Sequence, residues 1–125
     1  MKNVLVVDDS AVMRQMIKRM ISLHVQEANV IEAGNGQEAF EVLGQQSIDL
    51  VLSDINMPVM NGEQLLEKIR GTEALRTTKV LMVSTEGSAA RIERLKNLGA
   101  RFLRKPFSHE KLCAEIRGAF GGPNG

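Results

Sequence analysis

The residues of this chain that could do chemistry lie at the ends of short apolar runs. Asp8 and Asp9 follow the first run, and Asp54 follows the third. Ser84 follows the fourth run in the same way, and Lys105 follows the fifth. An aspartate after an apolar run is usually a turn residue or a helix cap. If the runs are neighbouring parallel strands, however, their carboxyl ends bring all five side chains to one rim of one sheet.

Such a rim would suit a divalent cation and a phosphoryl group. Adjacent carboxylates raise one another's pKa unless a cation lies between them, and a set without histidine or cysteine favours Mg²⁺ over zinc. A carboxylate beside Mg²⁺ can attack a phosphoryl group. The Ser84 hydroxyl and the Lys105 ammonium group would then bind the phosphoryl oxygens that the cation does not contact. His24 and His109 fall at predicted helix ends away from the rim, so both are interpreted as surface residues.

The elements that must position these residues alternate along the chain. Short apolar runs are separated by longer segments of helical period, which is typical of βαβ units and of a parallel sheet covered on both faces. The predicted strands are residues 4–7, 30–33, 49–53, 80–83 and 101–104. The pattern therefore predicts an α/β protein with a doubly wound sheet of five strands.

The first predicted helix begins near Ser10, and each of the other four follows a serine or asparagine that can cap it, namely Asn35, Asn61, Ser88 and Ser108. Glu38 and Gln64 lie three residues after the two asparagines, which is the capping-box pattern. Along the first helix the apolar stripe is predicted to face inward and consists of Met13, Met16, Ile17, Met20 and Ile21. Three basic residues are predicted to face outward, and these are Arg14, Lys18 and Arg19.

The composition fits one domain of ordinary size and excludes several classes of protein. The 125 residues are 43% hydrophobic and 25% charged. A net charge of +1 and 3% aromatic residues, all Phe, do not favour direct nucleic-acid binding. Cys113 is the only cysteine, so no internal disulfide can form, and no apolar segment reaches the length of a membrane span. Lys2 leads straight into a strand rather than a signal peptide, which predicts a cytoplasmic protein.

Four motifs in order carry a resemblance to a known family: Asp8-Asp9-Ser10-Ala11-Val12-Met13-Arg14, Asp54-Ile55-Asn56-Met57-Pro58-Val59-Met60-Asn61-Gly62, Ser84-Thr85-Glu86 and Lys105-Pro106-Phe107. With them, the chain from residue 2 to about 120 resembles the receiver domains of two-component response regulators, and among these the stand-alone regulators of chemotaxis. The resemblance implies a flavodoxin-like fold with five helices and strand order 2-1-3-4-5. It also implies a receiver domain over residues 1–120 and a flexible tail over 121–125.

The resemblance assigns a role to each residue of the predicted rim. Asp54 would be the phosphoacceptor, taking its phosphoryl group from the phosphohistidine of a histidine kinase. Asp9, Asp54 and the main-chain carbonyl of Asn56 would bind Mg²⁺ directly, and Asp8 would act through water. Relatives also have a cis peptide bond at the position of Lys105-Pro106.

The resemblance also implies how phosphorylation would be read out. Ser84 would move towards the phosphate, and Phe102, where many relatives have tyrosine or another aromatic, would turn inward without a hydroxyl to bond the helix-four loop or a partner. The face formed by helix four, strand five and helix five would then bind an acidic or amphipathic partner segment, such as one of a flagellar motor switch protein. The residues expected on that face are Ile92, Lys96, Arg101, Arg104 and Lys111.

Two further expectations concern regulation. Asn56 and Glu86 stand where relatives tune the access of hydrolytic water, which implies an acyl phosphate that lasts seconds to minutes. The resemblance further implies a signalling module with weak self-phosphorylation and self-dephosphorylation rather than a turnover enzyme, and the domain is expected to be a monomer. The segment from Gly99 to Lys105 is one residue shorter than the usual family spacing, so either its loop is tighter or the fourth helix ends differently.

Three alternatives remain open from the sequence. The chain could be a receiver cut from a larger regulator, such as a methylesterase or a transcription factor. It could be a phosphatase of the dehalogenase type, although that family has its nucleophile after the first strand in an Asp-x-Asp pattern, whereas Asp8 and Asp9 are adjacent. A flavin or nucleotide binder fits less well, because acidic residues after the first strand would repel phosphate.

Overall fold

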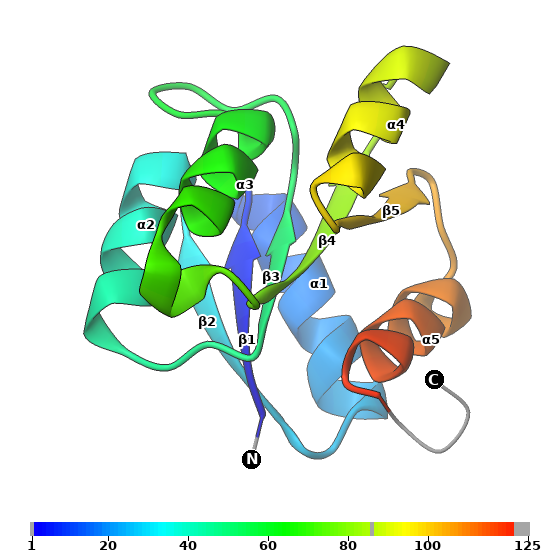
Figure 1. Cartoon of the computed structure of the whole chain (residues 1–125). Coiled ribbons are helices and arrows are strands. Elements are labelled where there is room, and N and C mark those ends of the chain that lie inside the picture. Colours follow the sequence, from blue (N-terminus) through cyan, green and yellow to red (C-terminus); the bar gives the residue numbers. More distant parts are fainter. Residues whose placement is uncertain (1, 86, 122–125) are drawn as a thin grey trace.

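The structure, a computed structural model, describes residues 2–85 and 87–121 (Figure 1). Its five strands form one parallel sheet in the order β2-β1-β3-β4-β5, which confirms the predicted topology. The strands are β1 (Lys2–Val7), β2 (Ala28–Ala33), β3 (Leu50–Ser53), β4 (Lys79–Ser84) and β5 (Arg101–Arg104). The helices are α1 (Ala11–His24), α2 (Gly36–Gln45), α3 (Gly62–Gly71), α4 (Ala89–Asn97) and α5 (His109–Ala119), with a short 3-10 turn at Glu73–Leu75.

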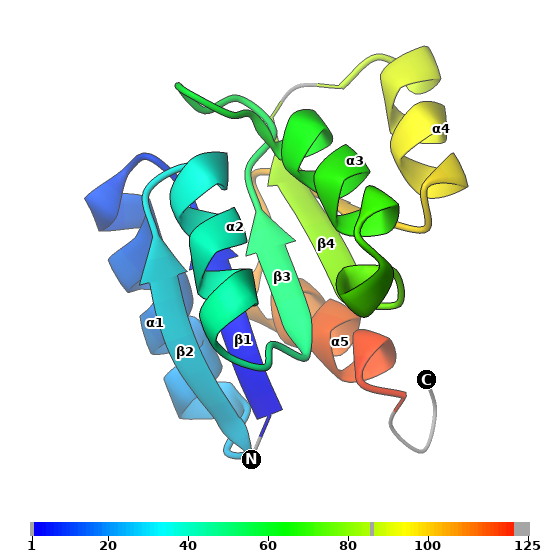
Figure 2. The ribbon, with the colours of Figure 1, turned by 60° about the vertical axis from the view of Figure 1, so that its left-hand side comes forward.

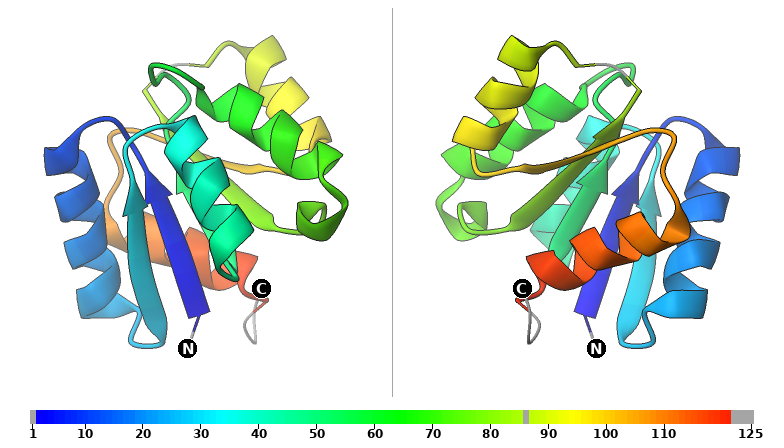
Figure 3. Two further views of the ribbon diagram at one scale, coloured as in Figure 1. Left: turned by 90° about the vertical axis from the view of Figure 1, so that its left-hand side faces the viewer. Right: turned by 90° about the vertical axis from the view of Figure 1, so that its right-hand side faces the viewer.

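Helices cover both faces of the sheet. Figures 2 and 3 show α1 and α5 on one face and α2, α3 and α4 on the other. Alternate residues of each central strand enter the two cores, so that Leu5 packs on the α2–α3 side while Val4 and Val6 pack on the α1–α5 side. This two-sided burial explains why the central strands appear in the sequence as unbroken apolar runs.

Several strand ends differ from the prediction by one or two residues. β1 and β2 both begin earlier than predicted, because their backbones pair from Lys2 and Ala28 onward, before the apolar residues start. β3 begins one residue later than predicted. Asp49 instead accepts a hydrogen bond from the backbone N–H of Asn3 (2.7 Å) through its side chain, which joins the ends of β1 and β3.

The four predicted cap residues each accept a hydrogen bond from a backbone N–H three residues on, and Ser10 caps α1 in the same way. At α3 the capping box is complete, because the Gln64 side chain also accepts from the N–H of Asn61 (3.0 Å). The box predicted at Asn35 does not close in this way. Glu38 accepts from the N–H of Gly34 (3.3 Å), one residue before the cap.

The prediction for the inward stripe of α1 was wrong at one position. Ile17 and Ile21 are buried, and Met13 and Met20 pack against the same core, but Met16 is 42% exposed. Because successive residues are about 100° apart around a helix, the position before Ile17 is turned away from the centre of the buried stripe.

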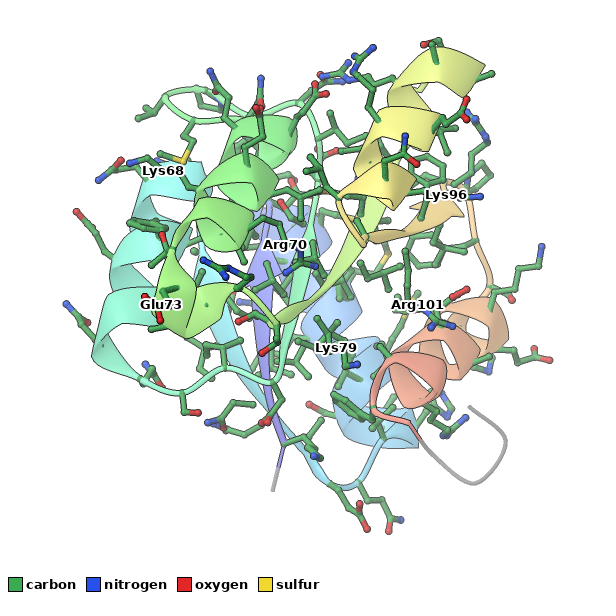
Figure 4. The ribbon with its side chains drawn as sticks, in the orientation of Figure 1. Lys68, Arg70, Glu73, Lys79, Lys96 and Arg101 are labelled. Atoms are coloured by element: carbon green, nitrogen blue, oxygen red, sulfur yellow. The ribbon has the colours of Figure 1, made fainter. Side chains whose placement is uncertain are left out.

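The connection from α3 to β4 is held by Arg70. Its Nε donates to the carbonyl of Leu98 (2.6 Å), and its Nη1 donates to the carbonyl of Thr78 (2.6 Å). Figure 4 shows this side chain pointing from α3 towards β4. After α4, Gly99 adopts φ +81° and Ala100 donates to the carbonyl of Leu95 (3.1 Å), so the chain turns tightly into β5.

Among the described residues, none of the helices is both long enough and apolar enough to cross a membrane. The predicted tail, apart from Gly121, lies outside the described residues.

Candidate functional site

The first two carboxylates are brought together by the pairing of β1 with β3. Val7 lies opposite Ser53 in the sheet, so the next residue of each strand, Asp8 and Asp54, emerges at the same rim. The backbone continues the ladder by one step, because the N–H of Asp54 donates to the carbonyl of Val7 (3.0 Å). In Figure 2 this rim lies at the heads of the strand arrows.

Asp9 completes an acidic cluster at the rim. One carboxylate oxygen from each of Asp8, Asp9 and Asp54 lies within 4.8 Å of the other two. Asp8 is buried, Asp54 is half-buried and Asp9 is exposed. The three predicted acidic residues are therefore together, as the sequence analysis expected.

Lys105 faces two of these carboxylates. Its Nζ lies 3.5 Å from Oδ2 of Asp8 and 4.0 Å from Oδ2 of Asp54, and its side chain is only 14% exposed. The predicted cis bond between Lys105 and Pro106 is present, and the N–H of Lys105 donates to the carbonyl of Ser84 (3.0 Å). The ends of β4 and β5 therefore aim this ammonium group into the acidic cluster.

Backbone N–H groups fix the orientation of two carboxylates. Ser10 donates to Oδ1 of Asp8 (2.8 Å), and Ile55 donates to Oδ1 of Asp54 (2.8 Å). In each case one oxygen is held by the main chain while Oδ2 faces Lys105. Both carboxylates thus present a defined oxygen to the centre of the site.

Arg14 is a site-supporting residue that the sequence analysis placed wrongly on the outer face of the helix. Its Nη1 donates to the main-chain carbonyl of Asp8 (2.5 Å), and its Nε pairs with Oε1 of Glu32 (3.1 Å). Only 20% of its side chain is exposed. The helical period places the Cα of Arg14 beside the buried stripe, and its long side chain extends from there back to the rim. The period of the sequence does not indicate where the end of such a side chain lies.

Burial raises the pKa of Asp54 above its ordinary value of 3.8. The Lys105 ammonium group and the N–H of Ile55 oppose this shift, while the negative charge of Asp8 adds to it. A cation placed among the three carboxylates would relieve both the repulsion and part of the lost solvation.

The donor set fits a hard cation such as Mg²⁺. All three side chains supply carboxylate oxygens, and oxygen ligands at 2.0–2.1 Å from Mg²⁺ lie at most about 4.2 Å apart across an octahedron. The three carboxylate oxygens lie within 4.8 Å of one another, which is close to that range. Asn56 is exposed just beyond Asp54.

The remaining predicted site residues have different surroundings. Ser84 is the last residue of β4 and is 1% exposed. Phe102 is half-buried and packs against the core on the α2–α3 side. Glu86, predicted to tune the phosphate lifetime, lies outside the described residues. A hydroxyl that sequence reasoning missed, that of Ser53, donates to the carbonyl of Asp54 (2.8 Å).

The predicted partner face is less uniform than the sequence suggested. Lys96 and Lys111 are exposed, and Ile92 is half-buried. Arg101 pairs with Glu115 on α5 (3.3 Å), and Figure 4 shows Lys96 and Arg101 in separate places, one at α4 and the other against α5. Arg104, the fifth predicted residue, donates to main-chain carbonyls of the loop between β4 and α4.

A doubly wound sheet with three carboxylates and one lysine at its switch point is the arrangement of a receiver domain. The family model of the response regulator receiver domain matches residues 4–117. The chain belongs to this family.

The relatives narrow the class to the CheY type. The chain is 36% identical to chemotaxis protein CheY1 of Helicobacter pylori over 94% of this chain and 95% of that protein. It is 32% identical to a CheY homologue of Campylobacter jejuni over 97% of this chain and 94% of the relative. The solved structure of CheY4 of Vibrio cholerae superposes with a TM-score of 0.86 at 33% identity, covering 95% of this chain and 98% of that one.

The comparisons also bear on the alternatives. A protein-glutamate methylesterase of Syntrophomonas wolfei is 40% identical over 84% of this chain, but the match spans only 30% of that larger protein. The CheY-type relatives match over nearly their whole length. Neither the phosphatase nor the flavin-binder interpretation gains support, because the family match is to receiver domains.

Proposed function

We propose that Asp54 accepts a phosphoryl group from the phosphohistidine of a histidine kinase, and that the protein acts in the control of chemotaxis. The observation that supports the proposal is that the Asp54 carboxylate shares one rim with Asp8 and Asp9, and that the Lys105 ammonium group lies within 4.0 Å of both Asp8 and Asp54. The names of the CheY-type relatives support the assignment to chemotaxis.

The chemistry is a displacement at phosphorus. A carboxylate oxygen of Asp54 forms the new P–O bond while the P–N bond to the donor imidazole breaks, and the imidazole keeps the electron pair and takes up a proton. Lys105, already held 4.0 Å from Oδ2 of Asp54, pairs with a phosphoryl oxygen. The Ser84 hydroxyl binds another oxygen.

Mg²⁺ would be held directly by Asp9, Asp54 and the main-chain carbonyl of Asn56, and by Asp8 through water. When bound, it neutralises the carboxylates and the phosphoryl oxygens that approach them. Ser10 and Ile55 support this arrangement, because their N–H groups already fix one oxygen each of Asp8 and Asp54.

Phosphorylation would act as a population shift. Ser84 moves towards the phosphate, and Phe102 then turns into the space behind it, which reshapes the surface formed by α4, β5 and α5. That surface binds a flagellar motor switch protein or another downstream target. The protein phosphorylates itself with small donors and loses the phosphoryl group within seconds to minutes, at a rate tuned by Asn56 and Glu86. It is therefore a signalling domain with a short-lived phosphorylated state rather than a turnover enzyme.

Intact-mass spectrometry after incubation with acetyl phosphate tests the proposal. The wild type should gain one phosphoryl group in Mg²⁺ and none in EDTA, and Asp54→Asn should gain none. Asp49→Asn is the matched control, because it removes an aspartate at the opposite end of β3 and should be phosphorylated normally. Equal phosphorylation of Asp54→Asn and wild type would overturn the assignment, and steady hydrolysis of a phosphate ester by the wild type would favour a phosphatase.

A further inference from the structure

Arg104 lies over the side chain that is expected to switch. Arg104 and Phe102 are two residues apart on β5 and therefore lie on the same face of the sheet. The guanidinium carbon of Arg104 is 5.5 Å from the centre of the Phe102 ring. Leu103, between them, packs into the core on the opposite face.

The same guanidinium group binds the chain between β4 and α4 at two described residues, Thr85 and Gly87, and this stretch is called the β4–α4 loop. Its Nη1 donates to the carbonyl of Thr85 (3.3 Å), and its Nη2 donates to the carbonyl of Gly87 (3.2 Å). One side chain of β5 therefore binds two carbonyls of the loop that follows Ser84.

The loop backbone also packs directly on Phe102. Gly87 has φ +146°, and a Cβ atom built there would lie 3.5 Å from Cζ of Phe102 and 3.1 Å from Cγ1 of Ile92. Because glycine has no side chain, the loop can approach both residues this closely. The Arg104 guanidinium, the Phe102 ring and the loop are thus parts of one contact.

We propose that Arg104 is a latch that holds the β4–α4 loop against β5 in the unphosphorylated protein, and that phosphorylation releases it. A tyrosine hydroxyl could bond this loop directly, but Phe102 has none, and Arg104 supplies the bonds from the same face of the strand. The inference rests on the proposed function, because release requires Ser84 and its loop to move towards a phosphate on Asp54.

The latch also determines whether the positive charge of Arg104 is available to a partner. While its guanidinium is bound to the Thr85 and Gly87 carbonyls, Arg104 has fewer donors to offer an acidic partner segment. Once the loop leaves, the planar guanidinium group is free to bind a carboxylate in the two-point manner that favours arginine over lysine.

Hydrogen exchange of the loop amides in the unphosphorylated protein tests the latch. Arg104→Met keeps an apolar stem over Phe102 but removes both donors, and loop exchange should become about 3- to 10-fold faster, as expected for the loss of one or two solvent-exposed hydrogen bonds. Arg104→Lys should give a smaller increase. Arg101→Met is the matched control, since it removes the same charge from β5 but breaks the pair with Glu115 on α5 rather than a bond to the β4–α4 loop.

A second arm separates a latch from a merely structural contact. With Mg²⁺ and beryllium fluoride, a mimic of the phosphoryl group, wild type and Arg104→Met should show equal loop exchange, because the contact is already broken. Two results would overturn the proposal. One is that, without the mimic, the loop amides of Arg104→Met exchange no faster than those of Arg101→Met. The other is that, with the mimic bound, Arg104→Met still exchanges faster than the wild type. Should Arg104→Met unfold, Arg104→Gln serves in the same two measurements. Failure of Asp54 to accept phosphate would refute the proposed function, whereas the exchange of the unphosphorylated protein reports on the latch alone.

Discussion

Replacing Val59 should stabilise the protein, because this residue has a backbone conformation that valine disfavours. Its φ is +68°, in the left-handed region that β-branched residues rarely adopt. The residue is 79% exposed, so little apolar contact compensates for the strain. Such a conformation costs an L-residue about 1–2 kcal/mol.

The structure shows what holds Val59 in place. The N–H of Met60 donates to the carbonyl of Pro58 (2.7 Å), which closes a tight turn around Val59. The carbonyl of Met60 then accepts from the N–H of Gly36 at the start of α2 (3.0 Å). Because the loop after Asp54 is anchored on both sides of the turn, changing residue 59 should leave the turn itself intact.

Asparagine tolerates positive φ, so Val59→Asn should recover most of the strain and gain about 1 kcal/mol of unfolding free energy. Val59→Gly should gain less, about 0.5 kcal/mol, because glycine also increases the entropy of the unfolded chain. Urea denaturation measures both changes as shifts in midpoint at constant slope. A gain of about 1 kcal/mol corresponds to a melting temperature about 3–5 °C higher.

Val12→Asn is the matched control for this experiment. Val12 is 81% exposed, much like Val59, but lies in the first turn of α1. Its replacement should change stability by less than about 0.5 kcal/mol. Val59→Asn that is no more stable than the wild type, with Val12→Asn unchanged, would refute the argument from backbone strain.

Two further predictions concern residues around the phosphoacceptor. Gly62→Ala should cost about 3 kcal/mol or more in urea denaturation, because the new Cβ would lie 2.2 Å from the main-chain oxygen of Asp54; Gly44→Ala, with nothing within 4 Å of its Cβ, should be neutral or stabilising. Asp54→Asn should be more stable than the wild type at neutral pH, because burial raises the pKa of Asp54 above 3.8. A raised pKa means that the folded wild type loses stability as the pH rises from 3.8 through the pKa of the folded state. The advantage should shrink to nothing as pH falls below 3.8, and an advantage that instead grew on acidification would contradict this sign.

The sequence predicted those features that depend on local pattern. Strand order followed from the family resemblance, and four of the five caps followed from single residues whose side chains accept from the backbone N–H three positions on. The acidic cluster was predictable because the carboxyl ends of parallel strands lie at one rim of the sheet. Residues that directly follow neighbouring strands are therefore close together, however far apart they are in the sequence.

The features that were missed depend on where long side chains end. Arg14 and Arg104 both reach main-chain carbonyls several residues away in sequence, and helical or strand period fixes only where such a side chain starts. The strain at Val59 was hidden for a related reason. A turn imposed by anchors on both sides can hold a residue that local propensity would exclude.

The most direct test of the central claim is to trap the acyl phosphate chemically. Borohydride reduces an aspartyl phosphate to homoserine, and peptide mass spectrometry locates the converted residue. We expect conversion at Asp54 alone, only when acetyl phosphate and Mg²⁺ are both present, and none in Lys105→Met under the same brief exposure. Homoserine at Asp8, at Asp9 or at any other aspartate, with Asp54 unchanged, would contradict the account.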